Sequence, residues 1–374
     1  MKAIRELMVK EFLQILRDKR MLPLVLLAPI IQVILLGYAA TVDVKNITLA
    51  VYDADESAES RGYLERFTNT GYFTIAGYVD HPDKLDEYLD ETRATLAIHI
   101  PLGFSRDIGA GKPVKVQLLA DGADANTANI SLNYAAQITA GYAESLLAER
   151  LTRIGGVSLP RIRAQTRVWF NPDLRSANYM IPGVVALILM IITTTFSAAA
   201  IVREKEAGTI EQILVTPIKP YQFMLGKLLP FIIIGFADVI LVLGVAVNWF
   251  DIPLKGSVLL LFGLCGLFIL TTLGLGLFVS TVSRTQQQAM MTAQFFIFFP
   301  FIFLSGFTFP IENMPPIIQG ITYLIPLRYF IEIVRGLFLK GVGLETLWPQ
   351  ALALLVFGVV ILSLSVARFQ KRLG

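Results

Sequence analysis

Cysteine, histidine and charged residues are scarce in this 374-residue sequence. The only cysteine, Cys265, rules out a disulfide within the chain, and its apolar neighbours predict a packing role. His81 and His99 have no cysteines or carboxylate cluster at ligand spacing around them, so no metal site is expected. Charged residues make up 16% of the chain and hydrophobic residues 55%, against about 25% charged in a typical soluble domain. This composition indicates a membrane protein.

Signals for nucleotides, nucleic acid and catalysis are also absent. The formal net charge is only +3, and no basic run is interleaved with aromatic residues, which argues against nucleic-acid binding. Gly111 and Lys112 are followed by Pro113, which breaks the phosphate-binding loop pattern. No nucleophile, base and orienting residue stand at a recognisable spacing, which disfavours a membrane-anchored hydrolase. We therefore expect that the chain is not itself an enzyme and binds no cofactor.

Long apolar runs dominate what is present, and six of them can each cross a bilayer. They cover residues 21–40, 179–202, 228–249, 258–282, 289–305 and 347–367. Residues 1–20 place apolar side chains on one helical face and basic side chains around the rest, which is typical of a helix lying in the membrane interface. The sequence predicts an α-helical multi-pass membrane protein with six transmembrane helices.

Residues 41–177 have the composition of a soluble domain inserted after the first span. Strand-like runs cover 47–52, 72–78, 94–100 and 114–120, and helix-like stretches cover 57–67, 82–90, 104–110 and 125–152. Residues 161–170 are a further expected strand. The alternation of the two patterns predicts an α/β domain. The transmembrane domain of five helices then occupies residues 178–374.

The distribution of basic residues predicts the orientation in the membrane. An even number of spans places both termini on one side, and residues 1–20 carry six Lys or Arg, while residues 203–227 carry four. The loop between the third and fourth spans holds only Lys255 as a cation. By the positive-inside rule the termini and residues 203–227 are cytoplasmic, and the α/β domain is extracytoplasmic. The protein is expected in the cytoplasmic membrane, in contact with lipid.

Residues 203–227 form a short charged island between two apolar runs. Thr209 and Gln212 have the spacing of a capping box, and Pro217 would end the helix that follows. The run EKEAGTIEQILVTP, followed by LGKLLP, resembles the signature of ABC-2 type transporter permeases, in the multidrug-efflux-like subfamily with a large extracytoplasmic domain. The resemblance implies a coupling helix at 203–217, seated in a separate ABC ATP-binding subunit that would bind ATP and magnesium.

Carboxylates and a glycine in this island are suited to contact with such a subunit, because Gly208 permits close backbone approach and carboxylates pair with Arg or Lys. The alternative is that Gly208 and Thr209 only turn and cap the helix. The expected contact residues are Arg203, Glu204, Glu206, Gly208, Thr209, Glu211 and Gln212.

Residues 309–346 form neither a clean span nor a loop, because four prolines divide them into short apolar pieces. We expect re-entrant helices here, surrounded by protein rather than lipid. The run PLRYFIEIVRGLFLKG is similar to the segment that forms an extracellular gate in ABC-2 permeases, and Glu312 precedes it. Glu332 lies four residues after Arg328 and three before Arg335, so all three can pair on one helical face.

Two further features are candidates for a substrate pathway. Asp238 is the only ionisable residue in the apolar stretch of the third span, so it serves either a substrate or proton path or an interhelical hydrogen bond at the subunit seam. The fifth span is rich in aromatic residues, which line a hydrophobic pathway or face lipid. The candidate pathway residues of that span are Thr292, Phe295, Phe296 and Phe299.

The resemblance implies ATP-driven export of an amphipathic substrate, either a drug-like compound or a lipid. Six spans form half of the usual pathway, so a second copy or a similar permease is expected as partner. A rival hypothesis is a signal or force transmitter, in which the outer domain acts on an envelope adaptor without transport. A continuous apolar cavity between two copies would favour export, and a tightly packed seam would favour transmission.

Overall fold

The computed structural model describes residues 2–17, 21–40, 46–153, 169–172, 175–208 and 220–370. The chain divides into two compact units. The membrane unit comprises Met1–Val42 and Arg167–Gly374, and the α/β unit comprises Asp43–Thr166. Each unit has its own hydrophobic core.

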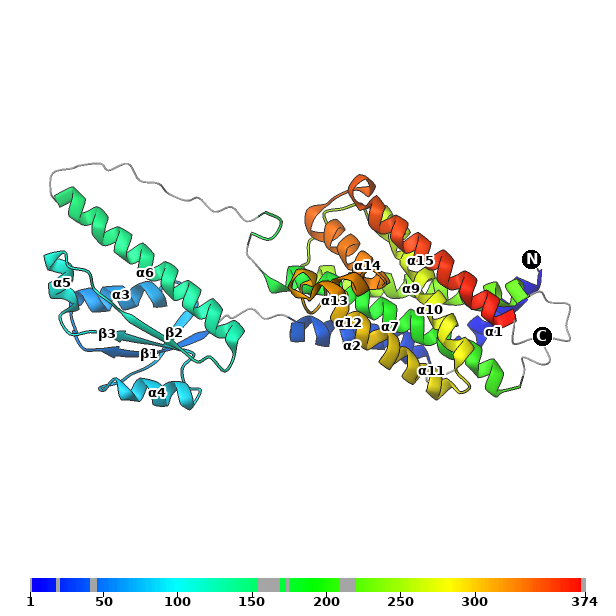
Figure 1. The fold of residues 1–374 in the computed structure, drawn as a ribbon, viewed down its shortest axis with the longest axis horizontal. Coiled ribbons are helices and arrows are strands. Elements are labelled where there is room, and N and C mark those ends of the chain that lie inside the picture. Colours follow the sequence, from blue (N-terminus) through cyan, green and yellow to red (C-terminus); the bar gives the residue numbers. More distant parts are fainter. Residues whose placement is uncertain are drawn as a thin grey trace. The chain divides into compact units, whose positions relative to one another are not determined.

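The α/β unit is built on a four-stranded sheet with strand order β2-β1-β3-β4 (Figure 1). The strands are β1 (Ile47–Asp53), β2 (Phe73–Tyr78), β3 (Leu96–Ile100) and β4 (Gln117–Ala120). β1 pairs in parallel with both β2 and β3, and Leu49 stands opposite Leu96. β4 pairs antiparallel with β3. The first three predicted strands are present, and the fourth begins at Gln117 rather than at residue 114.

Helices cover both faces of this sheet. They are α3 (Ala58–Thr68), α4 (Asp83–Asp90), α5 (Phe104–Ala110) and α6 (Ala125–Arg153). Tyr63 and Phe67 of α3 join Ala135 of α6 in the core on one face, whereas Leu85 of α4 packs with Ala50 on the other (Figure 1). The strand expected over 161–170 lies outside the described residues, except for residues 169 and 170, which form a bend.

Asp55 fastens the end of β1 to the beginning of α5. Its carboxylate accepts hydrogen bonds from the backbone N–H groups of Gly103 at 2.8 Å and Ser105 at 2.9 Å. Because the hydrogen bond from Ser105, followed by one from Ser57, favours the ionised form, the pKa of Asp55 falls to about 2. The carboxylate is therefore ionised at any physiological pH.

The membrane unit contains a helix at every predicted span. Those that begin the unit are α1 (Lys2–Arg17) and α2 (Met21–Ala40), and the later long helices are α7 (Ser176–Glu206), α9 (Pro220–Asn248), α10 (Val258–Val282) and α15 (Leu344–Gln370). The fifth span is composite, with α11 (Gln286–Thr292), the π-helical η1 (Ala293–Phe298) and α12 (Phe299–Leu304).

Five helical segments among the described residues are long and apolar enough to cross a membrane. α2 has 20 residues, which span about 30 Å, the thickness of the hydrocarbon core. Helix α13 (Pro316–Thr322) and the continuous α14 (Pro326–Arg335) and η3 (Gly336–Lys340) meet at a bend of 80° and reach spanning length only together. The predicted fold class, a multi-pass helical protein with an α/β domain, is confirmed.

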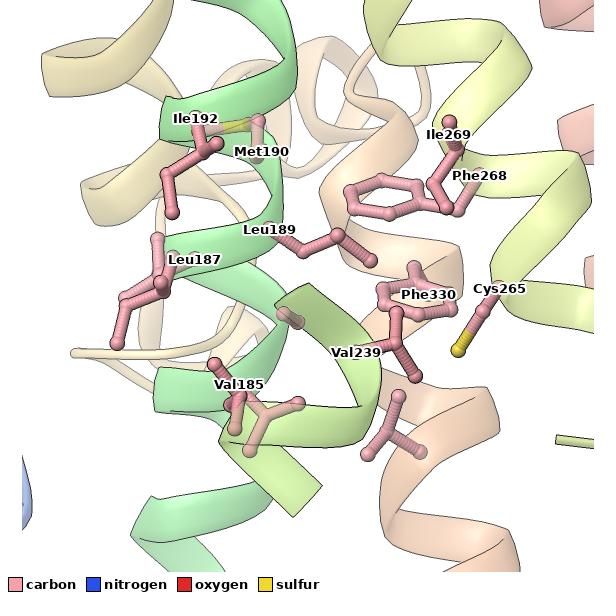
Figure 2. Close-up of a cluster of buried hydrophobic side chains, with 14 of the residues drawn as sticks. Val185, Leu187, Leu189, Met190, Ile192, Val239, Cys265, Phe268, Ile269 and Phe330 are labelled. Atoms are coloured by element: carbon pink, nitrogen blue, oxygen red, sulfur yellow. The ribbon is translucent and has the colours of Figure 1, made fainter. Parts of the chain in front are cut away.

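Helix α7 forms the centre of the membrane unit and is buried along nearly its whole length. α10 packs closely against it, because a Cβ atom at Gly276 would overlap the carbonyl oxygen of Thr194. Figure 2 shows Leu189 of α7 beside Phe268 of α10 and Phe330 of α14, whose rings stack with centroids 3.9 Å apart. Cys265 is buried in the same region, as its apolar context predicts.

Candidate functional site

The charged island is shorter in the structure than in the sequence prediction. Arg203 lies within the last turn of α7, which ends at Glu206, and α9 already begins at Pro220. Gly208 has a φ of +68°, the left-handed conformation with which glycine commonly terminates a helix. Residues 203–206 of the predicted coupling helix thus belong to α7, and residues 209–217 lie outside the described residues, so the coupling helix itself stays a prediction.

Three of the expected contact residues lie outside the part of the chain that the structure describes. They are Thr209, Glu211 and Gln212. Their contact with an ATP-binding subunit stays a prediction, as does that of the exposed Glu206 and Gly208.

A buried ion-pair network joins the two ends of the island. The ammonium nitrogen of Lys227, near the start of α9, lies 2.7 Å from Glu204 Oε1 and 2.6 Å from Glu11 Oε1. Lys10 also reaches Glu204 Oε1, at 2.8 Å. The Lys227 side chain is only 2% exposed, so each carboxylate compensates for the cost of burying its charge.

Glu204 is thus turned into the protein rather than toward a partner. Its side chain is 5% exposed, and this placement does not support the expected contact with another subunit. Instead, Glu204 fixes the end of α7 to Lys227 of α9, while Lys10 and Glu11 bring α1 into the same network. Sequence reasoning missed this site because its members come from three separate parts of the chain, residues 10–11, 204 and 227.

Close apolar packing reinforces the contact between α1 and α9. A Cβ atom at Gly226 would lie 2.7 Å from Cβ of Leu7, so only glycine permits this approach. Leu7 is one of the apolar residues of the predicted interfacial face of α1. The face that was expected to rest in the membrane interface is therefore partly occupied by α9.

The other side of the α7 terminus is tied to the beginning of α11. The backbone N–H of Gln286, the first residue of α11, donates to Glu206 Oε1 at 3.0 Å, and its side chain donates to the other carboxylate oxygen. A carboxylate at a helix N-terminus is favoured by the helix dipole. Arg203 donates to Gln286 Oε1 at 3.3 Å, and Lys205 donates to the Ser280 carbonyl oxygen.

Asp238 lies in the interior of the membrane unit. Its side chain is 0% exposed, and neither carboxylate oxygen has a hydrogen-bond partner among the described residues. Asp238 thus forms no interhelical hydrogen bond within the described part of the chain, and a hydrogen bond at the subunit seam stays a prediction. An ionised carboxylate is costly in such a place, so the site favours a protonated acid or a bound cationic group.

The aromatic residues of the fifth span lie on the surface of the chain. Phe295 stacks on Phe299 with ring centroids 5.7 Å apart, and Phe296 is 76% exposed. Thr292, Phe295 and Phe296 line a shallow hollow of about 590 Å³. The structure thus brings these four candidate pathway residues together on one mostly exposed helical segment.

The charged residues of segment 309–346 do not pair as one set. Arg328 Nε lies 3.9 Å from Glu332 Oε1, a long ion pair, and its guanidinium also stacks over the Tyr323 ring at 4.0 Å. Glu332 accepts a hydrogen bond from Gln350 at 2.9 Å. Glu312 is exposed in the 3₁₀ turn Ile311–Asn313.

Arg335 turns away from Glu332 toward α7, so the expected triple pairing is wrong. Its guanidinium lies 3.6 Å from the centre of the Tyr179 ring and donates to the carbonyl oxygens of Tyr179 and Gly306, each at 3.2 Å. The aromatic face and two carbonyl groups offer this cation more contacts than one half-exposed carboxylate. Arg335 therefore links segment 309–346 to the beginning of α7.

Comparison with known proteins agrees with this architecture. Residues 19–367 match the family described as ABC-2 family transporter protein. The chain is 32% identical over 363 residues to the probable multidrug ABC transporter permease YbhR of Escherichia coli K12, covering 97% of both chains. It is 31% identical over 373 residues to YbhS, a probable multidrug ABC transporter permease of the same strain, covering 100% of this chain and 98% of that one.

A third relative is the inner membrane transport permease YhhJ of Escherichia coli K12. The two proteins are 29% identical over 381 residues, which cover 100% of this chain and 98% of YhhJ. The match extends through both units, because it includes the α/β unit as well as the spans. The chain belongs to the ABC-2 family and is a permease subunit of an ABC transporter, in which a separate subunit binds and hydrolyses ATP.

Proposed function

We propose that this permease exports an amphipathic molecule, a drug-like compound or a lipid, across the cytoplasmic membrane. ATP hydrolysed by a partner docked at residues 203–217 would drive the export. The observation that carries the proposal is the attachment of the beginning of this segment to the spans on two sides, through Glu204 with Lys227 and through Glu206 with Gln286. YbhR and YbhS are named as probable multidrug permeases, which supports the substrate class, and YhhJ as an inner membrane permease, which supports the location.

The attachments give a physical route for a push on the coupling segment. On one side Lys227 transmits displacement to α9 and, through Glu11, to α1. On the other side Glu206 holds the N-terminus of α11, which continues into the aromatic fifth span. A movement of the α7 terminus would therefore reach the candidate pathway residues directly, without a long chain of intermediates.

The fifth span is the proposed meeting surface with a second permease. Most of its length is exposed in the single chain, although it is apolar. Phe295, Phe296 and Phe299 would then line an apolar pathway between two copies, or between this chain and a similar permease. The bent segment α13–α14, held by Arg335, would close that pathway at the outer side.

The proposed orientation follows the basic residues. Both termini and the end of α7 would be cytoplasmic, and the α/β unit would lie outside, where an envelope adaptor is a candidate partner. Asp238 is proposed as a protonatable or substrate-binding group, because its carboxylate has no partner among the described residues.

ATPase measurements test the proposal. The permease and its ATP-binding subunit would be purified together in lipid nanodiscs, and hydrolysis followed across a panel of drugs and lipids. We expect particular amphiphiles to stimulate hydrolysis and the Glu206→Ala/Glu211→Ala variant to lose this stimulation. Glu345→Ala, an exposed change at the start of α15, is the matched control and should retain it. Robust hydrolysis that is indifferent to every compound would contradict export and favour force transmission.

A further inference from the structure

A groove in the α/β unit has no part in the proposed transport pathway. It lies between α3, α5, the C-terminal half of α6 and the segment that leads into β4, and its volume is about 560 Å³. Small-molecule sites in proteins typically measure about 300 to 1,000 Å³. We call it the α5–α6 groove, and its principal lining residues are Tyr63, Phe104, Ile108, Lys112, Tyr142 and Arg150.

Aromatic rings occupy much of the groove wall. The ring of Tyr63 lies 5.9 Å from that of Phe104 and 5.2 Å from that of Tyr142, measured between centroids. The Tyr63 hydroxyl is hydrogen-bonded to Thr139 at 2.7 Å, and the Tyr142 hydroxyl donates to the Glu59 carbonyl oxygen at 3.2 Å. Tyr63 and Phe104 are almost completely buried, so the more exposed Ile108, Tyr142 and Leu147 offer the apolar contact surface for a ligand.

A fixed arginine marks one end of the groove. Arg150 donates to the carbonyl oxygens of Ile108 at 3.2 Å and Gly109 at 2.7 Å, which belong to the last turn of α5. The guanidinium lies directly over Gly111, where any Cβ atom would overlap it. This arrangement holds the cation rigidly beside the loop that follows α5.

Lys112 places a second cation at the same end. It follows Gly111 directly and is exposed, and its ammonium group has no hydrogen-bond or ion-pair partner among the described residues. Of the two acidic lining residues, Glu149 already has an interaction within the chain. The other, Glu59 of α3, lies beside Tyr142. Tyr142 precedes Arg150 by eight residues, which is about 12 Å along α6. The available positive charge is thus concentrated at one end.

We propose that the α5–α6 groove binds a small amphipathic anion. A flat apolar body would contact Tyr142 and Leu147, and an acidic group would pair with Lys112 beside the guanidinium of Arg150. The proposal does not depend on the proposed export function, because every residue that carries it belongs to the α/β unit.

Protection of an introduced cysteine tests this proposal on the intact permease in nanodiscs. Cys265 is buried, so Ala143→Cys in the groove can be labelled selectively with a membrane-impermeant maleimide. The probes are 1-anilinonaphthalene-8-sulfonate and its uncharged analogue N-phenyl-1-naphthylamine. Glu87→Cys on α4, on the opposite face of the sheet, is the matched control site.

We expect the anionic probe to slow labelling of Ala143→Cys about fivefold at a free concentration about four times its Kd, and to leave Glu87→Cys unchanged. The uncharged analogue should need a concentration about tenfold higher. Equal slowing at both cysteines, no slowing at any soluble concentration, or equal potency of the two probes would overturn the proposal. A cysteine at 143 that does not react without probe would overturn it too, since another part of the assembly would then fill the groove.

A charge reversal at the rim supplies a second readout. Lys112→Glu should weaken the anionic probe about tenfold and leave the uncharged analogue unchanged. Lys115→Glu makes the same change in net charge on an exposed residue that does not line the groove, and it should have little effect. Equal weakening by both substitutions would show a general surface potential and would contradict a site at Lys112.

Discussion

Ion pairs occur in both units, but they differ in burial and therefore in what they contribute. In the membrane unit Lys227 pairs with two carboxylates and is 2% exposed. In the α/β unit Lys84 lies 2.6 Å from Asp80, at a similar distance, yet its side chain is 49% exposed. Water screens the exposed pair, whereas breaking the buried network leaves an uncompensated charge. Similar geometry thus carries different energetic weight in the two regions.

Removing the buried cation should have the largest effect. Lys227→Met leaves Glu11 and Glu204 without their shared partner, so the free energy of local unfolding should fall by about 3 to 5 kcal/mol. Lys84→Met should have little effect, because water screens the exposed pair. Hydrogen exchange on the intact chain measures each region separately.

The combined variant Lys227→Met/Glu204→Gln/Glu11→Gln sharpens this test, because it removes the stranded charges and should recover part of the loss. Equal effects of Lys227→Met and Lys84→Met would mean that the network does not hold α1, α7 and α9 together.

Two glycines contrast tight and open packing. Gly276→Ala places a methyl group against the Thr194 carbonyl oxygen and should destabilise the membrane unit by about 1 to 3 kcal/mol. Gly141→Ala on α6 meets no atom within 4 Å and should stabilise its helix by about 0.5 to 1 kcal/mol. Thermal unfolding followed by hydrogen exchange in each helix shows whether each substitution destabilises or stabilises its helix. A stabilising effect of Gly276→Ala would refute the close α7–α10 packing.

Substitution of Asp238 should change export much more than it changes the stability of the protein. Asp238→Asn removes a carboxyl group that has no partner among the described residues, so the variant should unfold no more easily than the parent, within about 1 kcal/mol. Export and its pH dependence should nevertheless change if the proposed role is correct. Transport with an unaltered pH profile in this variant would remove Asp238 from the pathway.

Acid should affect the α/β unit through Asp55, with the smallest effect of the series. Its folded pKa of about 2 lies below the ordinary value of about 3.9, so its stabilisation is complete above pH about 4 and is lost as the pH falls through 2. Asp55→Asn should remove this dependence and cost about 1 kcal/mol at neutral pH. Exchange protection of the Gly103 and Ser105 amides across that pH range measures it, and unchanged protection at pH 2 would refute the assignment.

The spans could be predicted from the sequence because membrane thickness requires a minimum apolar length. The predicted limits 21–40 and 258–282 coincide with α2 and α10. The π-helical η1 inside the fifth span could not be predicted, since its residues continue the same apolar pattern as the α-helix around it. The β4 strand begins late because an apolar stretch does not specify which residues reach the neighbouring strand.

The sites were harder to predict than the spans. Lys227 counted in the sequence only as one of four cations near a membrane surface, and Glu204 as a contact residue. Their pairing depends on the folding of three helices, and nothing in the spacing from 11 to 227 indicates it. The same holds for the α5–α6 groove, whose walls come from segments on three separate helices and a loop.

The most direct test of the account is ATP-driven uptake of a fluorescent amphiphile into inside-out vesicles that contain the permease and its ATP-binding subunit. We predict uptake that requires ATP, is lost with Glu206→Ala/Glu211→Ala and is retained with Glu345→Ala. Uptake that is unchanged in the Glu206→Ala/Glu211→Ala variant, with the ATP-binding subunit still bound, would contradict coupling through residues 203–217.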